Sequence, residues 1–225
     1  FNLGVDAHFV TPGGSGQGFF DNAGTFRKTT SGTALFGQAQ GVTFANTGTV
    51  EVLGGVLQLG SSLTTATHTG TFTLSAGTTL AVVGGTHAFS NTSITGAGAF
   101  AISGGVALLP AATTFQVGHL QLNGGTLSGA GTLETLDFIW SGGTLGSGGG
   151  ALSILAGGTG SASGAALGNL TGFTLRNAGT FTWNALDVSG QVRFTLSGRF
   201  VNEATGTFNL GVDAHFVTPG GSGQG

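Results

Sequence analysis

The stretch HLQLNGGTLSGAGTLETLDFIWSGGTL, residues 119–145, decides the fold. Runs in which apolar and polar residues alternate, at 119–122 and 132–140, are separated by Gly-Gly pairs at 124–125 and 142–143. Period-two alternation with β-branched and aromatic residues is typical of β-strands. Glycine adopts the positive φ angles that tight corners require. This stretch therefore predicts short strands joined by glycine corners.

The same alternation continues on both sides of this stretch, and its corners recur. The offsets between successive Gly-Gly pairs are 30, 20, 20, 18 and 15, so a short period of about 20 residues runs through the chain. A period of this size without helices predicts a β-solenoid, in which coils stack because a single coil is too small to fold alone. The pairs lie at 54–55, 84–85, 104–105, 124–125, 142–143 and 157–158.

A second recurring corner has the sequence Asn-x-Gly-Thr followed by Phe or Val. Its asparagine and glycine are the residue types that occupy tight corners, so we assign them a structural role. These structural corner residues are Asn22, Gly24, Asn46, Gly48, Asn177 and Gly179.

A long period encloses the short one. The first 18 residues, FNLGVDAHFVTPGGSGQG, recur without change at 208–225, which is an offset of 207 residues. We interpret 1–207 as one full solenoid repeat unit and 208–225 as the start of the next identical repeat, the same coil met twice. We also expect the chain to be a window of a longer tandem array. At about 20–23 residues per coil, one unit would hold about nine or ten coils.

The alternative fold is a series of antiparallel β-sandwich domains. Sandwich strands recur every ~8–12 residues with larger connecting loops. The recurring corners and the lack of a Trp/Cys core signature favour the solenoid.

The composition excludes several classes of protein. Charged residues make up 6% of the chain and hydrophobic residues 39%. Disordered chains are rich in charge and poor in hydrophobic residues, so this composition argues against disorder. Glycine is 47 of 225 residues, but there is no collagen-like period and only 3 prolines. The chain has no cysteine, so it holds no disulfide framework. A net charge of −3 with no basic run argues against nucleic-acid binding, and no stretch approaches the ~20 apolar residues of a membrane span.

The strand and corner text resembles a known group of proteins. LNGGTLSGAGTL at 122–133, WSGGTLGSGGG at 140–150 and FANTGTVEVLGGVLQLG at 44–60 are similar to the β-strand repeats of bacterial autotransporter passenger domains and filamentous-haemagglutinin-like exoproteins. The resemblance implies a right-handed parallel β-helix, export to the cell surface, and a role in adhesion or surface structure. The chain departs from this group in its letter-for-letter repeat of 18 residues, because family repeats are usually degenerate.

Catalytic and metal-binding patterns are weak throughout the sequence. Glu134 and Asp137 are three apart, so one strand would place them on opposite faces, although carboxylates on neighbouring coils could still meet. Residues 13–21 approach a calcium-binding repeat, but Gln17 replaces the expected aspartate. Asp6 and His8 share a strand face. We predict no catalytic residue, no metal site and no cofactor.

Two further patterns could carry binding. Alternate threonines from 65 to 73 would form one row, of the kind found on ice-binding solenoids, if neighbouring coils repeated it. Trp140 and Trp183 would suit sugar stacking if they were exposed, but we expect both to fill the interior.

These observations predict a structural or adhesive fibre without enzymatic activity, located outside the cell or on its surface. The expected partner is the chain itself, through end-to-end continuation and lateral assembly, with surface glycans or neighbouring cells as further partners. Nucleic acid and membrane insertion are not expected for this segment. The alternative is a β-helical protein that binds or degrades polysaccharides, which would need a cluster of acidic and basic residues on one face.

Overall fold

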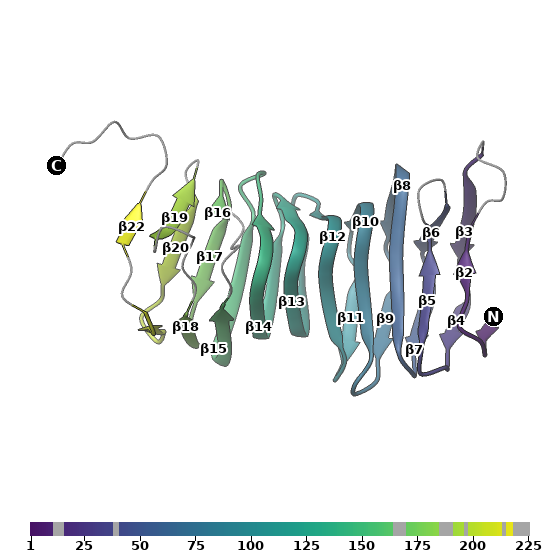
Figure 1. The fold of residues 1–225 in the computed structure, drawn as a ribbon, viewed down its shortest axis with the longest axis horizontal. Coiled ribbons are helices and arrows are strands. Elements are labelled where there is room, and N and C mark those ends of the chain that lie inside the picture. The colour runs from purple at the N-terminus through teal and green to yellow at the C-terminus, as the bar shows by residue number, and fades with distance from the viewer. Residues whose placement is uncertain are drawn as a thin grey trace.

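The structure is a computed structural model that describes residues 1–10, 16–37, 41–163, 170–184, 191–195, 198–212 and 215–217. All regular structure in these residues is β-strand, and every pair of neighbouring strands is parallel. The strands stack side by side along the long axis, with β1 and β22 at opposite ends (Figure 1). The chain therefore forms a parallel β-solenoid, which confirms the predicted fold class.

Each coil has three strand segments, and equivalent segments stack into three faces, here called A, B and C. On face A, short separate strands begin the series, and the first segments of longer strands continue it. Face A consists of β1 (Asn2–Leu3), β4 (Thr25–Lys28), β7 (Thr49–Val52), β9 (Thr71–Leu74), β11 (Ser93–Gly96), the starts of β13 (Thr114–Gly129), β14 (Thr132–Leu145) and β15 (Ala151–Ala162), then β17 (Thr174–Asn177) and β20 (Arg199–Asn202).

Face B follows face A along the chain in every coil. It consists of β2 (His8–Phe9), β5 (Thr33–Phe36), the starts of β8 (Val56–His68), β10 (Thr79–Phe89) and β12 (Ala99–Leu109), later segments of β13, β14 and β15, then β18 (Thr180–Trp183) and β21 (Thr207–Leu210).

Face C closes each coil and leads into face A of the next. It consists of β3 (Gly18–Asn22), β6 (Val42–Asn46), the final segments of β8, β10, β12, β13 and β14, then β16 (Leu170–Thr171), β19 (Gln191–Thr195) and β22 (His215–Val217).

The coil length varies along the stack. Paired residues lie 18 positions apart at Leu122 and Trp140 and 27 apart at Trp183 and Leu210. The short period of the sequence is therefore confirmed as the coil length. The Gly-Gly pairs do not all lie at the same corner of the coil. Gly54-Gly55 and Gly157-Gly158 lie at the A/B corner, whereas the four pairs from 84 to 143 lie at the B/C corner.

Close approach of the backbone explains the glycine stack at the B/C corner. A Cβ on Gly125 would lie 2.7 Å from the carbonyl oxygens of Gly104 and Gly105 in the coil before. A Cβ on Gly143 would overlap the carbonyl of Gly124. Gly105 and Gly143 also have φ angles of +63° and +78°, which other residues rarely adopt. Successive coils can turn this tightly only because glycine stacks on glycine.

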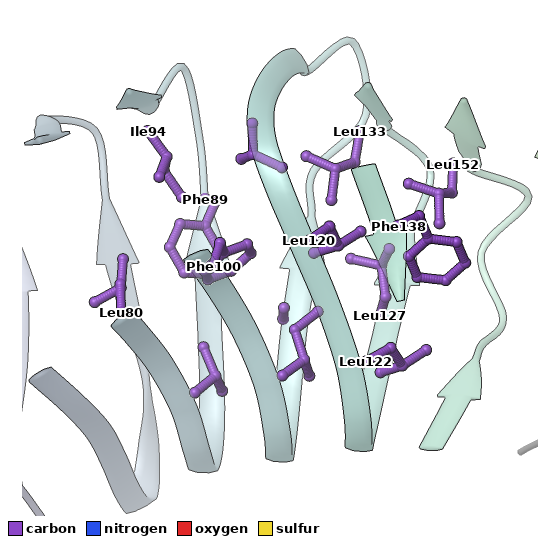
Figure 2. Packing of buried hydrophobic residues seen from close by; sticks show 14 of the residues in the cluster. Leu80, Phe89, Ile94, Phe100, Leu120, Leu122, Leu127, Leu133, Phe138 and Leu152 are labelled. Carbon is purple, nitrogen blue, oxygen red and sulfur yellow. The ribbon is translucent and has the colours of Figure 1, made fainter. Parts of the chain in front are cut away.

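One continuous apolar core fills the interior. Leu80, Phe89 and Phe100, with other leucines and phenylalanines, point into the space between the faces (Figure 2). Neighbouring coils fill the core with side chains of complementary size. One coil carries the small residues Gly160 and Ala162. The coil before it carries Phe138 and Trp140 at the paired positions, and the coil after it carries Phe181 and Trp183. The two indole rings contact each other at 5.8 Å across that coil. Small residues in one coil therefore make room for large ones in its neighbours.

The two copies of the repeated segment lie on different faces. In the first copy, Asn2 is on face A and His8 on face B, where they pair with Arg27 and Leu35. In the second copy, Asn209, the equivalent of Asn2, is on face B and pairs with Thr182. The repeated segment therefore contributes two strands in each copy, but the strands of the second copy are displaced by one face. The expectation of the same coil met twice is corrected in this respect.

The predicted threonine row does not form a single line. Thr65 and Thr67 belong to face C, whereas Thr71 and Thr73 belong to face A, because a corner at Thr69 separates them. A different row does cross the coils: Thr25, Thr49, Thr71 and Ser93 pair in register on face A.

Candidate functional site

The corner asparagines form hydrogen-bonded ladders inside the solenoid. Asn22 and Asn46 occupy the corner between faces C and A, and Nδ2 of Asn22 donates to Oδ1 of Asn46 (2.8 Å) and to the carbonyl of Thr49 (3.0 Å). At the A/B corner, Nδ2 of Asn177 donates to Oδ1 of Asn202 (2.7 Å). Asn46 and Asn177 are fully buried. The ladders therefore satisfy backbone carbonyls that would otherwise lack partners at the corner.

The glycines of the same motif are not needed for the positive φ angles that the sequence analysis associates with glycine at corners. None of Gly24, Gly48 and Gly179 has a positive φ. A Cβ on Gly48 would overlap the carbonyl of Gly24, and a Cβ on Gly179 would overlap that of Gly158. Glycine is needed at these two positions for close approach between coils rather than for a left-handed backbone.

A buried lysine is the most unusual charged group of the described residues. Lys28 is fully buried, and its Nζ donates to the carbonyls of Thr30 (2.7 Å) and Gly54 (3.0 Å). Burial lowers the pKa of Lys28, and the Asp6 carboxylate, 3.9 Å away, partly opposes this. Asp6 also accepts a hydrogen bond from Oγ1 of Thr30. Asp6 therefore anchors an A/B corner, while His8 lies further along on β2.

The acidic pair considered for catalysis is divided by a corner. Glu134 lies on face A beside Gln116 and Ser153, and Asp137 lies on face B. Asp137 accepts hydrogen bonds across the coils, because Oδ2 is 3.3 Å from Nδ1 of His119 and Oδ1 accepts from Thr159 (3.0 Å). The structure thus does not bring Glu134 and Asp137 together as a pair.

Two histidines that are 19 residues apart in sequence meet in the interior. Nε2 of His68 lies 3.1 Å from Nδ1 of His87, and the rings stack at 5.3 Å. Both side chains are fully buried, and within the described residues His68 Nδ1 and His87 Nε2 have no hydrogen-bond partner. Burial lowers the pKa of His87 to about 4, and burial together with the neighbouring His87 lowers the pKa of His68 well below its usual value.

Face A is interrupted between two coils. The sheet that begins at β1 ends at β11, and the first segment of β13 pairs onward with β14. The corners that precede β11 and β13 each contain a non-glycine residue with positive φ, Asn91 (52°) and Ala112 (59°). A groove of about 510 Å³ lies at this interruption, which we call the seam. Its lining comprises residues 92–96 and 114–118 with Leu136.

The seam presents neutral groups only. Its side chains come from threonine, serine, glutamine and apolar residues, so it offers hydroxyl, amide and backbone groups but no charge. Thr92 is held by a hydrogen bond from its Oγ1 to the carbonyl of His68 (2.5 Å). The seam has no general acid, base or nucleophile of perturbed pKa, and nothing in its lining points to a particular ligand.

The remaining predicted features are the two tryptophans and the calcium-like loop. Trp140 and Trp183 are 1% and 2% exposed, which confirms the predicted interior location and removes them as sugar-stacking platforms. Residues 13–15 of the calcium-like loop lie outside the described residues. Gln17, at the position of the missing aspartate, donates to Oγ1 of Thr43 (2.6 Å).

The buried histidine pair and the seam were not anticipated from the sequence. The 19-residue spacing of His68 and His87 is close to the coil length, so the short period could have indicated their contact. In the sequence, the seam is marked by the corner at 110–113, which contains Pro110 and no glycine.

No known family matches the chain, and no curated protein and no solved structure is similar to it. Among the residues that the structure describes, no group of three or more His, Asp or Glu side chains could hold a metal ion. The described part also has no helix that is long and apolar enough to cross a membrane.

Proposed function

We propose that the chain is a structural and adhesive element of an extracellular or cell-surface fibre, built from tandem solenoid units and without catalytic activity. The observation that carries the proposal is the combination of a parallel stack with an 18-residue sequence repeated 207 residues apart. A stack whose sequence repeats can lengthen without any change of local structure. The resemblance to bacterial exoproteins supports the cell surface as the location.

The arrangement of charged groups is consistent with a passive role. The closest ion pairs link neighbouring coils, Arg27 with Glu51 and Arg176 with Glu203, and all four side chains are partly exposed. Such exposed pairs reinforce coil register only weakly. The alternative, degradation of polysaccharides, would need opposed carboxylates that the described residues do not present.

Electron microscopy and fibre diffraction test whether the chain forms rods. We expect negative-stain and cryo-electron micrographs of the purified chain to show rods, and oriented samples to diffract at ~4.8 Å along the rod axis. A beads-on-a-string outline, or a ~4.8 Å reflection perpendicular to the long axis, would contradict the proposal. Adhesion is tested separately, by the retention of cells or glycans on surfaces coated with the chain. Failure of that test would leave a structural role only.

A further inference from the structure

We propose that a recess along the A/B edge of the central coils binds an uncharged oligosaccharide chain. The recess lies between the A/B corners at 75–78 and 155–158. It would supply the contact with glycans that the proposed adhesive role requires, so the inference deepens the proposed function and rests on it.

The lengths of successive A/B corners create this recess. The corner at 75–78 has four residues, and the next, at 97–98, has two. The following two corners are the single residues Gly118 and Leu136, and the corner at 155–158 again has four. A shorter corner carries the chain less far outward, so the three short corners form a notch between two longer ones. The long corners are four coils apart, which is roughly 19 Å at ~4.8 Å per coil.

The notch joins two concave surfaces on either side of the edge. On the face B side lies a cleft of about 290 Å³, where residues 97–99 meet the side chains of His119, Gln121 and Asp137. On the face A side lies the seam, which Leu136 lines at the edge itself. The seam alone indicates no ligand, but the notch adds polar groups on one side and an exposed aliphatic side chain in the middle. Ligand sites commonly combine an apolar surface with a few convergent polar groups.

Hydrogen bonds between coils hold the polar side of the notch in place. Oδ2 of Asp137 lies 3.3 Å from Nδ1 of His119, and Oδ1 accepts from Oγ1 of Thr159 (3.0 Å). Beneath them, the fully buried Thr135 donates from Oγ1 to the carbonyl of Asp137 (2.8 Å) and lies 3.3 Å from the carbonyl of Gly118. Groups that are already fixed lose less conformational freedom when a ligand binds.

The side chains around the notch offer mainly hydrogen-bond acceptors. A carboxylate only accepts, so Nδ1 of His119 carries the proton that faces Asp137, and Nε2 of the neutral ring is left as an acceptor on the side away from Asp137. Glu134 and Asp137 flank Leu136 on faces A and B. The sequence has no lysine or arginine from residue 53 to residue 175. The notch therefore favours a ligand that has many hydrogen-bond donors and no negative charge.

The placement of the two carboxylates favours hydroxyl groups over a cation. Glu134 and Asp137 lie on different faces, so they do not converge on one ammonium group. An uncharged glycan carries hydroxyl donors along its whole length and can reach both sides of the edge, with the apolar face of a sugar ring against Leu136. The same separation leaves the glycan uncleaved, because hydrolysis needs two carboxylates that face each other across one glycosidic bond.

Titration calorimetry with tetrasaccharides of different charge tests the class of ligand. We expect the purified chain to bind at least one of the uncharged glucose, mannose and N-acetylglucosamine tetramers, with an affinity that does not fall as salt is added. Tetragalacturonate, which is anionic, should not bind. Tighter binding of the cationic tetraglucosamine, weakened by salt, would identify a cation site and overturn the proposal. A lack of binding by every uncharged tetramer at its solubility limit would also overturn it.

A substitution that fills the notch shows where the glycan binds. Ala97 is exposed in a short corner, so Ala97→Phe should fold like the wild type and lower the affinity for the uncharged tetramer by about tenfold or more. Ala156→Phe is the matched control, because Ala156 is exposed in the long corner at 155–158. It should leave the affinity unchanged. Equal affinities of the two variants would place the glycan elsewhere on the rod.

A second pair of variants removes a contact instead of adding bulk. Leu136→Ser should weaken binding about fivefold, because the sugar ring loses its apolar contact. Leu53→Ser is the control, since Leu53 is 48% exposed at another A/B corner and Leu136 is 50% exposed. The control should bind like the wild type. Loss of affinity in both variants, or in neither, would contradict the proposal.

Retention of cells on coated surfaces separates failure of the site from failure of the function. Surfaces coated with Ala97→Phe should retain fewer cells than surfaces coated with the wild type. If the two retain cells equally, the adhesive role stands and the notch is not its site. If the wild type retains neither cells nor glycans, the site and the adhesive role fail together.

Discussion

Several buried polar side chains in this solenoid are held by neighbouring coils as well as by their own. Lys28 is bonded by the carbonyl of Gly54, and Asn46 by its contacts with Asn22, in each case across coils. The His68–His87 pair follows the same rule but leaves one ring nitrogen on each side chain without a partner. A buried neutral pair of this kind resists protonation, since a charge there would lack solvation.

Acid should therefore destabilise the fold through these two residues. The pKa of His87 is about 4 in the folded chain, and that of His68 is also lowered. The unfolded state then binds more protons below pH ~6.5, so the free energy of unfolding falls as the pH drops from there toward about 4. Each histidine steepens this fall, up to the limit of one additional proton bound per histidine on unfolding.

Urea unfolding at a series of pH values measures this slope. The double variant His68→Leu/His87→Leu should have a shallower acid slope than the wild type, whereas His8→Leu, at an exposed position, should not. The same acid slope in the wild type and the double variant would show that the buried pair is not responsible.

Among the elements, the corners determine how coils stack, and glycine serves them in two different ways. Gly77 and Gly143 have nearly the same φ, +75° and +78°. A Cβ on Gly77 would meet no atom within 4 Å, whereas one on Gly143 would overlap the preceding coil. The first corner needs only backbone freedom, and the second also needs space.

Alanine substitution separates these two requirements. Gly77→Ala should cost about 1–2 kcal/mol through its left-handed backbone alone. Gly143→Ala should cost more, because the corner must also shift away from Gly124. Thermal or urea unfolding of the two variants provides the comparison. Equal losses of stability would show that contact between coils does not limit the B/C corner.

The strands and the period follow from residue alternation and glycine spacing, but the identity of each corner does not. Gly54-Gly55 and Gly84-Gly85 read alike in sequence, yet they lie at different corners, which is why the interval between them is longer than one coil. Contacts between coils depend on a coil length that varies along the stack, as the pairing of Leu122 with Trp140 and that of Trp183 with Leu210 show. The environment of Lys28 was therefore out of reach of the sequence alone, whereas the spacing of His68 and His87 is close enough to the coil length to have indicated their contact.

For the whole molecule, the seam is a place where one of the three ladders between neighbouring coils is interrupted. On both sides of it, faces B and C continue through β12 and β13, but face A does not. Because a solenoid is stabilised by contacts between neighbouring coils, the loss of one ladder weakens that interface relative to the others.

Hydrogen exchange should reveal this weakness as local opening. We expect faster amide exchange in Ser93–Gly96 and in residues 114–117 than in Thr49–Val52, which pairs with strands on both sides. Mass spectrometry of the native chain at neutral pH measures the difference. Uniform protection of all three segments would mean that the seam carries no loss of cohesion.

The displacement of the repeated segment by one face has a mechanical consequence for a filament built from tandem units. A rod with a seam on one face is more compliant in one direction and would curve if every unit placed its seam on the same side. A rotation by one face at each junction distributes the compliant side around the axis. Three successive units then average to nearly isotropic bending stiffness, and the filament stays straight over long distances.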